Sequence, residues 1–417
     1  MTESFIAPEY QADGTIRPAR YAFRGSSETG WDVVREGRVH CRFGPGYRLL
    51  ASSHCGVCAT DLARRHLPFR LPQVTGHEVV ARTDSGALCV VEINASHAAR
   101  GVAPCDVCRR GLDRHCPDRL VLGIHDLPGG FGPWILAPVG AVVPLPAAIS
   151  PATATLVEPF AAALHAVDTI APADGDRIAV LGPRRLGLLV IAALAARRTE
   201  RRGRYEILAI ARRPALRSLA RSMGADDALA VPSSPQPLAD VVVDTTGHPD
   251  GLELAAALAR REVHVKSTTG HPSLGLRHVT ELVVDELTLA PASEAPPSAD
   301  AVVTTSLAEI DAAIRPEPGT ERASVPPRGR ILVSDVGQPR DGVLAALLDR
   351  GLRFTTSRCG DLRSATTLLS KSSLGQRLGE QLVTDVVPAD HLADAFERAQ
   401  RPEHLKIIVS HPGGAVA

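Results

Sequence analysis

Lysine is nearly absent from this chain, which has it only at positions 266, 371 and 406, although lysine and arginine together number 46. The 46 acidic residues balance the basic ones, and no block of like charges stands out. A nucleic acid or an anionic membrane is therefore not expected as a partner. The longest apolar run, Leu186 to Ala196, is too short to cross a bilayer, and the first residues carry no secretory signal pattern.

A disulfide framework is missing as well. Eight cysteines in 417 residues are too few for one, and most of them cluster at spacings typical of metal sites. We therefore expect a reducing, cytoplasmic compartment. The length allows two domains with separate cores, and the 44% hydrophobic content is that of an ordinary globular protein.

The residues with the most chemistry lie in the stretch CGVCATDLARRHLPFRLPQVTGHE, from Cys55 to Glu78. Cysteine, histidine and glutamate are ligands of catalytic zinc, so we expect Cys55, His77 and Glu78 to bind one zinc ion. Thr60 can exchange a proton with an alcohol, and Asp61 can accept the second ring N–H of a liganding histidine. Each residue alone fits an ordinary structural role, but the ordered set favours a metal site.

This stretch resembles the run CGxCGTD followed by GHE in the zinc-containing alcohol, polyol, glucose and threonine dehydrogenases of the medium-chain dehydrogenase/reductase superfamily. Further matches follow in the family's order along most of the chain. They are GGFGPW at 129–134, LVEPFAAALHAV at 156–167, VLGPRRLGLL at 180–189, DVVVDTTGHPDGLELA at 240–255, SRCGDL at 357–362 and ADAFERAQRPEHLKIIV at 393–409.

The resemblance implies an α/β protein with two domains. Residues 1–170, completed by about 358–417, are expected to form a GroES-like catalytic domain of the antiparallel β-barrel type. Residues 171–357 are expected to form a Rossmann domain, a doubly wound parallel sheet that binds the cofactor. The alternation of strands and helices from Asp176 onward independently predicts a parallel sheet with crossover helices.

Glu158 is a further candidate. In the polyol and glucose branch of the family, a glutamate at this point approaches the catalytic zinc from the opposite wall, so the resemblance makes Glu158 a candidate ligand and catalytic residue. A carboxylate here also fits the start of a helix, where the helix dipole favours negative charge. The family's extension of the proton relay would fall on Ala63, which cannot carry a proton; the onward path would then run through water or His66.

Three more cysteines, Cys105, Cys108 and Cys116, have the spacing of a structural zinc site. The family places four cysteines in this region, and the first one falls on Val102, which cannot bind a metal. The candidates for a fourth ligand are a water, Asp106, Asp113 and His115; alternatively the region is free of metal and held by packing.

The sequence from Gly182 to Gly187 lies between a predicted strand and a predicted helix and matches a nucleotide-binding turn. Its second glycine is replaced by Arg184, which either crowds the pyrophosphate or pairs with it. The resemblance assigns further cofactor contacts along the chain. The full candidate set is Gly182, Arg184, Leu186, Gly187, Arg212, Arg213, Thr245, Thr246, Ser267 and Thr268.

The second strand of this domain, predicted at 207–210, runs into Ala211, Arg212 and Arg213 instead of the acidic residue that bonds the ribose of NAD. Arginine pairs well with a 2′-phosphate, so we expect NADP rather than NAD. Exposed arginines are common in an arginine-rich chain, which keeps NAD as the alternative.

A departure from the family follows LVVDELTL at 282–289, because an insertion at about 291–345 precedes the SRCG turn. Its Pro-rich segments predict loops, and 301–304 and 331–335 predict strands. A strand, a Gly-x-Pro, a helix and a strand occur twice, around Gly270 and around Gly337, as a local duplication would produce. The insertion could cover the active site, form an oligomer contact or be surface decoration.

These features predict a zinc-dependent dehydrogenase that transfers hydride reversibly between NADP(H) and a small secondary alcohol, polyol or sugar-like substrate. The resemblance implies a homodimer or homotetramer. Two alternatives stay open. One is a redox-neutral enzyme of the same fold, such as an epimerase or eliminase. The other is a catalytically silent nucleotide-sensing scaffold, which the departures at Ala63, Val102 and Arg184 favour.

Overall fold

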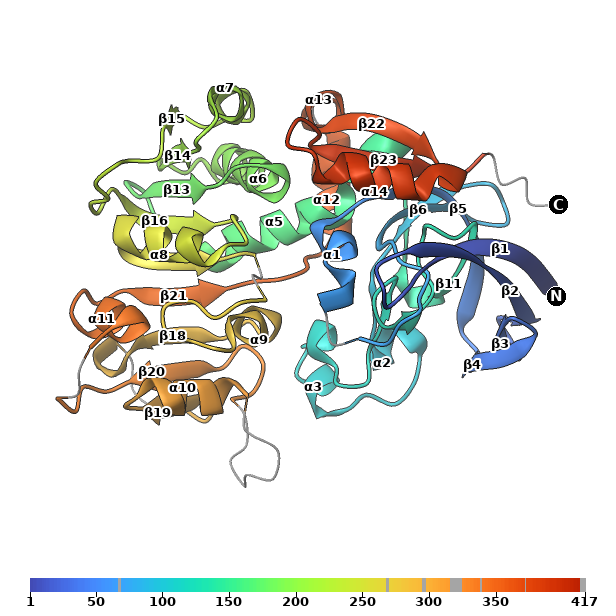
Figure 1. Cartoon of the computed structure of the whole chain (residues 1–417), viewed down its shortest axis with the longest axis horizontal. Helices are drawn as coiled ribbons and strands as arrows, with labels where there is room; N and C mark the ends of the chain where they lie inside the picture. The colour runs from blue at the N-terminus through green and yellow to red at the C-terminus, as the bar shows by residue number, and fades with distance from the viewer. Residues whose placement is uncertain are drawn as a thin grey trace. The chain divides into compact units, whose positions relative to one another are not determined.

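A computed structural model describes residues 1–66, 69–267, 270–294, 298–315, 325–337, 340–371 and 373–412. The chain forms two compact units, which are Met1–Glu158 together with Asp361–Ala417, and Pro159–Gly360 (Figure 1). Among the described residues no helix is both long enough and apolar enough to cross a membrane.

The main sheet of the first unit has the strand order β12-β7-β6-β5-β23-β22, and β11 also pairs with β5. All these neighbours are antiparallel except β22 and β23. The strands are β5 (Tyr47–Gly56), β6 (Glu78–Arg82), β7 (Leu88–Val91), β11 (Trp134–Pro138), β12 (Val142–Pro144), β22 (Val383–Pro388) and β23 (Lys406–Ser410). The C-terminal strands thus complete a sheet begun in the first hundred residues.

The first 45 residues carry no clear family signal, yet they form an antiparallel sheet of their own. Its strands are β1 (Thr2–Tyr10), β2 (Ile16–Ser26), β3 (Gly30–Arg35) and β4 (Arg38–Phe43). The β1–β2 turn contains Asp13 and Gly14, and Gly14 has a φ of +83°. An Asp-Gly pair between two extended segments is a hairpin signal, so this element was detectable from the sequence.

Short elements complete the first unit. A small sheet contains β8 (Asn94–Ala95), β9 (Leu120–Leu122) and β10 (Asp126–Leu127). The helices are α1 (Ala59–Leu62), α2 (His97–Arg100), α3 (Asp106–Arg109), α4 (Pro151–Ala154), α12 (Leu362–Lys371), α13 (Leu374–Leu382) and α14 (Leu392–Gln400), and α5 (Val157–Ile170) begins at the boundary of the two units.

The second unit contains one nine-stranded sheet in the order β15-β14-β13-β16-β17-β21-β18-β20-β19 (Figure 1). The first six strands are parallel, which confirms the Rossmann prediction. The strands are β13 (Arg177–Leu181), β14 (Glu206–Ile210), β15 (Asp227–Leu229), β16 (Ala239–Asp244), β17 (Ala259–Val265), β18 (Thr288–Pro291), β19 (Ala301–Thr304), β20 (Arg330–Val333) and β21 (Arg353–Thr356).

The helices of this unit connect the parallel strands. They are α6 (Arg185–Arg201), α7 (Pro214–Ser222), α8 (Pro249–Leu258), α9 (Val279–Val284), α10 (Leu307–Ile314) and α11 (Gly342–Leu348). The central strands are buried almost without interruption, as in Ile178–Leu181 and Val241–Val243. Continuous apolar strands of this kind form where helices cover both faces of a parallel sheet.

The insertion does not lie on the surface as decoration, because it supplies strands to the sheet. Residues 239–291 form β16-α8-β17-α9-β18, and residues 301–356 repeat this order as β19-α10-β20-α11-β21. In the sheet the last strands of the two repeats have exchanged places. Strand β21 pairs in parallel with β17, β18 pairs in parallel with β20, and β18 and β21 meet antiparallel at Leu289 and Phe354.

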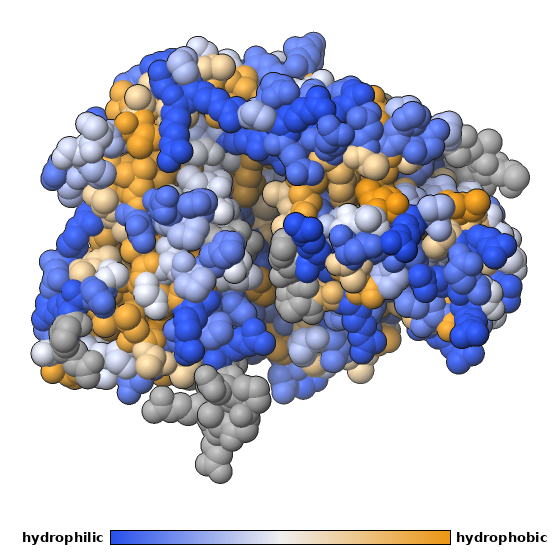
Figure 2. Space-filling model, in the orientation of Figure 1, coloured by the Kyte–Doolittle hydropathy of each residue, from blue (hydrophilic) through white to orange (hydrophobic). Residues whose placement is uncertain are grey.

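The two repeats also share one hydrophobic core. Val263 and Leu282 of the first repeat belong to the same buried cluster as Ile310, Ile331 and Leu347 of the second. On the surface, hydrophilic side chains cover much of the face shown in Figure 2, with apolar ones between them. The exposed large apolar side chains of the described chain include Val302 and Val303 on the edge strand β19.

Candidate active site and metal-binding lobe

The two ends of the Cys55–Glu78 stretch are brought together by strand pairing. Strand β5 ends at Gly56 and β6 begins at Glu78, and these two residues are register partners in the antiparallel pair. The residues between them form α1 and the loop that returns to β6. The ligand candidates from the two ends therefore meet at one end of the main sheet.

Three side chains form a group with the chemistry of a catalytic metal site. Cys58, His77 and Glu78 each offer one ligand atom, and these atoms lie within 4.8 Å of one another. His77 and Glu78 are buried, whereas Cys58 is half-buried. Cysteine, histidine and glutamate are the ligand types that bind zinc while leaving a position for water or substrate. The donor set therefore fits zinc.

In this structure the sulfur that lies beside His77 and Glu78 is that of Cys58 and not, as expected, that of Cys55. Cys55 is part of β5, and its side chain is fully buried beside Gly76, where an added Cβ would lie 2.8 Å from the Cys55 sulfur. Burial, followed by the charges of Asp61 and Glu78, raises the pKa of the Cys55 thiol well above its usual range. It therefore behaves as a core thiol rather than a ligand.

Asp61 connects the two parts of the group. Its carboxylate accepts hydrogen bonds from the backbone N–H of Cys58, at 2.9 Å, and of Gly76, at 3.2 Å. The same carboxylate lies 3.5 Å from Nδ1 of His77. Burial alone would lower the pKa of His77, but Asp61 and Cys58 together outweigh it by their charges and hydrogen bonds and raise that pKa well above its usual range. Asp61 thus lies where an orienting carboxylate is needed.

Lys406 is a site residue that the sequence interpretation missed. Its ammonium group forms a buried ion pair with Oε2 of Glu78 and donates a hydrogen bond of 3.3 Å to the carbonyl of Val57. A Cβ at Gly56 would collide with this Glu78 oxygen, so the glycine makes room for the pair. The signal available was the rarity of lysine, since Lys406 is one of only three lysines in the chain.

Glu158 and Thr60 lie near the group without belonging to it. Glu158 is in the first turn of α5, and its carboxyl is not among the three clustered ligands. Burial raises the pKa of Glu158 to about 7, with Glu78 also raising it and His77 lowering it, so these charges are within electrostatic reach. Thr60 Oγ1 lies 3.7 Å from the sulfur of Cys58. Ala63 is exposed, and the side chain of His66 lies outside the described residues.

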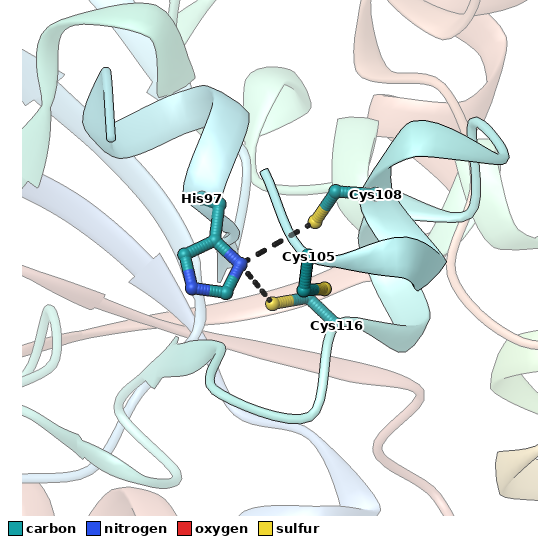
Figure 3. A group of neighbouring side chains, drawn as sticks. All are labelled: His97, Cys105, Cys108 and Cys116. Atoms are coloured by element: carbon teal, nitrogen blue, oxygen red, sulfur yellow. Dashed lines mark hydrogen bonds between the residues drawn. The ribbon is translucent and has the colours of Figure 1, made fainter. Parts of the chain in front are cut away.

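A second group of metal-ligand type lies between β8 and β9. We call residues 97–119 the cysteine lobe. Cys105, Cys108 and Cys116 gather there around His97, with all four ligand atoms within 4.8 Å of one another (Figure 3). The histidine was not foreseen, because His97 lies outside the cysteine spacing. Val102, at the position of the family's first cysteine, points outward with 49% of its surface exposed.

In the second unit, the predicted nucleotide-binding turn lies between β13 and α6. Gly182 has a φ of +72°, a conformation that favours glycine. A Cβ on Gly182 would come within 2.7 Å of Thr246, and one on Gly187 within 2.5 Å of Thr245 Oγ1. The two threonines at the end of β16 therefore pack directly against the turn. Both glycines are needed for this close contact.

The other proposed cofactor residues lie at the same carboxyl ends of the parallel strands. Arg184 is the N-cap of α6 and has a φ of −102°, so its backbone does not require glycine. Leu186 is half-buried in the first turn of α6. Arg212 and Arg213 are exposed after β14, and Arg213 is the N-cap of α7.

The residues that follow β17 complete this edge of the sheet. Ser267 Oγ accepts a hydrogen bond of 2.8 Å from the backbone N–H of Gly247. Lys266 is buried and donates to the carbonyl and hydroxyl of Ser357 at 2.9 and 3.1 Å. Thr268 lies outside the described residues.

Comparison with known proteins agrees with this architecture. Residues 44–147 match the alcohol dehydrogenase GroES-like domain. L-galactonate-5-dehydrogenase of Escherichia coli is 30% identical over 35% of this chain, and the match spans 44% of that protein. L-threonine 3-dehydrogenase of Rhizobium etli is 29% identical over 54% of this chain and 68% of its own.

Solved structures match over nearly the whole chain. L-idonate 5-dehydrogenase from Escherichia coli aligns with a TM-score of 0.65 at 15% identity, covering 98% of this chain and 99% of that one. An NADP-bound candidate zinc-binding dehydrogenase from Sinorhizobium meliloti has a TM-score of 0.61 at 17% identity, covering 98% and 99%. The chain is therefore similar to these dehydrogenases and has their fold, a GroES-like domain joined to a Rossmann domain.

Proposed function

We propose that this protein is a zinc-dependent dehydrogenase that transfers hydride between NADP(H) and a small secondary alcohol or polyol. The observation that carries the proposal is the group of Cys58, His77 and Glu78, with Asp61 against His77 and Thr60 beside Cys58. The named relatives act on threonine and galactonate, both of which have a secondary hydroxyl, and this supports the substrate class.

The roles of the residues follow from their positions. A zinc ion held by Cys58, His77 and Glu78 would supply a Lewis acid that lowers the pKa of a substrate hydroxyl. Asp61 fixes the orientation of His77 and, through the amide of Cys58, the loop that presents the sulfur. Thr60 Oγ1 accepts the hydroxyl proton and passes it onward. Lys406 balances the charge of Glu78 when that carboxylate is not needed as a ligand.

The cofactor assignment is part of the same proposal. NADP supplies the hydride acceptor. The turn from Gly182 to Gly187 would receive the pyrophosphate at the start of α6, because backbone N–H groups of a helix N-terminus bind phosphate. Arg212 and Arg213 would pair with the 2′-phosphate. The proposal includes assembly into a homodimer or homotetramer. It also includes a reducing compartment, which is compatible with the eight free cysteines.

The test compares two neighbouring cysteines. In Cys58→Ser the catalytic zinc and the turnover of alcohols with NADP should both be lost. In the control Cys55→Ala the zinc should remain, because Cys55 only fills space in the core. The readouts are elemental analysis and a screen of polyols, sugar acids and hydroxy amino acids with both cofactors at 340 nm. If Cys55→Ala loses the zinc and Cys58→Ser keeps it, the assignment is wrong.

A further inference from the structure

The cysteine lobe contains a complete set of four ligands. Nδ1 of His97 lies 3.1 Å from the sulfur of Cys116 and 3.7 Å from that of Cys108, and Cys105 completes the cluster (Figure 3). Zinc–sulfur and zinc–nitrogen bonds of about 2.3 and 2.0 Å place tetrahedral ligand atoms roughly 3.5–3.8 Å apart. The four side chains therefore already have nearly the spacing of a tetrahedral site.

The histidine is oriented from its other side. Nε2 of His97 lies 3.4 Å from a carboxylate oxygen of Asp118, so Nδ1 is the nitrogen that faces the sulfurs. His97 is the first residue of α2, and the hydroxyl of the N-cap Ser96 accepts a hydrogen bond of 3.3 Å from Ala99. A carboxylate on the far nitrogen of a histidine is the usual partner arrangement at zinc sites, because it fixes the tautomer.

The lobe has almost no hydrophobic core to hold it. Within residues 97–119 the only buried side chains are Cys108, His115 and Cys116, and the apolar Val102 is half exposed. Small segments with little apolar burial are commonly stabilised by a disulfide or a metal ion. The cysteines are all free thiols, so the structure contains no disulfide here.

We propose that the cysteine lobe binds one zinc ion through Cys105, Cys108, Cys116 and Nδ1 of His97, with Asp118 as a positioning residue. On binding, the three thiols release their protons and the imidazole coordinates in its neutral form. Zinc with three thiolates and one neutral imidazole has a net charge of −1, whereas zinc with four thiolates has a net charge of −2. His97 thus replaces the cysteine that the family has at the position of Val102, and it does so from a different element of the fold.

This proposal does not depend on the proposed activity, because it is read from metal content. The test uses the full chain with Cys58→Ser, so that the lobe is the remaining zinc site. That protein should hold about one zinc ion. Adding His97→Ala should remove most of it, whereas the matched control His115→Ala, which changes the other histidine of the lobe, should retain it. Equal zinc content in both histidine variants would overturn the proposal, as would a Cys58→Ser protein without zinc.

A second measurement keeps the proposal testable if His97→Ala does not fold. X-ray absorption on zinc in Cys58→Ser should fit three sulfurs and one nitrogen at about 2.3 and 2.0 Å. In His97→Cys the zinc should remain and the spectrum should change to four sulfurs. A nitrogen or oxygen ligand that persists in His97→Cys would show that another residue or a water is the fourth ligand and would refute the assignment.

The role of Asp118 has its own readout. Asp118→Asn should leave the ligand set unchanged by X-ray absorption but weaken zinc binding about 10- to 100-fold in chelator competition. Asp106→Asn, which changes an exposed aspartate of the same lobe, should have no effect on the zinc affinity. Equal affinities in Asp118→Asn and the parent protein would rule out the positioning role.

Discussion

Lys406 and Glu78, 328 residues apart in the sequence, form an ion pair buried within the first unit. The pair joins the first residue of β23 to the first residue of β6, and β5 lies between these two strands in the sheet. The C-terminal strand therefore does more than widen the sheet, because it delivers the cation that neutralises a candidate zinc ligand.

Replacing this lysine should leave a buried carboxylate without a partner. We expect Lys406→Met to lower the free energy of unfolding of the metal-free protein by about 3–5 kcal/mol in urea titrations. Zinc should restore part of that loss if Glu78 can turn toward the metal. The control Lys371→Met changes an exposed lysine, so its effect should stay within about 0.5 kcal/mol. A loss as small as that of Lys371→Met would show that the ion pair contributes little to stability.

The hydroxyl of Thr60 is expected to carry the proton. Thr60→Val keeps the shape and removes the hydroxyl, and it should lower kcat about 10²- to 10⁴-fold while zinc content stays constant. Thr60→Ser should recover most of the activity. Steady-state kinetics with the best alcohol substrate, together with elemental analysis, gives the answer. Similar rates in Thr60→Val and Thr60→Ser would assign the proton transfer elsewhere.

Cofactor preference should depend on Arg212 and Arg213. A charge-assisted contact with phosphate contributes roughly 1.5–3 kcal/mol, so NADP should be preferred about 10- to 100-fold in kcat/KM. The double variant Arg212→Ala with Arg213→Ala should lose most of that preference and leave kcat/KM with NAD nearly unchanged. Arg184→Ala serves as the comparison, since it faces a pyrophosphate common to both cofactors. If kcat/KM fell equally with both cofactors in the double variant, these arginines would not recognise the 2′-phosphate.

The stability of the second unit should fall in mild acid because of His264. This side chain is fully buried between the hydroxyls of Thr355 and Ser357, each at 2.8 Å. Burial, then the positive charges of Lys266 and His165, lowers the pKa of His264 well below its usual range. Below about pH 6.5 the unfolded chain takes up a proton that the folded protein does not, so stability decreases as the pH falls.

The measurement is the free energy of unfolding between pH 7 and pH 5. The wild type should lose up to about 1.4 kcal/mol per pH unit through this histidine below pH 6.5. In His264→Gln that part of the slope should disappear, whatever the overall stability of the variant. His391→Gln, which changes an exposed histidine, should keep the wild-type slope. Parallel slopes in His264→Gln and the wild type would contradict the prediction.

Local signals in the sequence were sufficient to predict the Rossmann domain, whereas the GroES-like domain was expected from the family resemblance. Apolar strands alternating with helices, and the glycines at 182 and 187, indicate a Rossmann domain, because each feature depends only on neighbouring residues. Which of Cys55 and Cys58 lies beside His77 and Glu78 could not be predicted from neighbouring residues in the same way. It depends on where β5 ends, and a boundary error of a few residues decides which sulfur is buried in the core.

Contacts between distant residues could not be predicted from the pattern. His97 joins the cysteine lobe because α2 starts directly after β8, whereas the spacing of the cysteines pointed to Val102 and to nearby side chains. Lys406 reaches Glu78 only through the order of strands in the main sheet. Both are consequences of topology, which the motifs do not specify.

The exchange of β18 and β21 has a consequence for any deletion within the second repeat. Excising residues 298–335 would remove β19, α10 and β20, and with them the parallel partner of β18. Strand β21 would keep its place beside β17, and β18 would become an edge strand that pairs only with β21, at Leu289 and Phe354. Because β18 is mostly buried and apolar, such a deletion would uncover an apolar strand edge, which favours pairing between chains and aggregation.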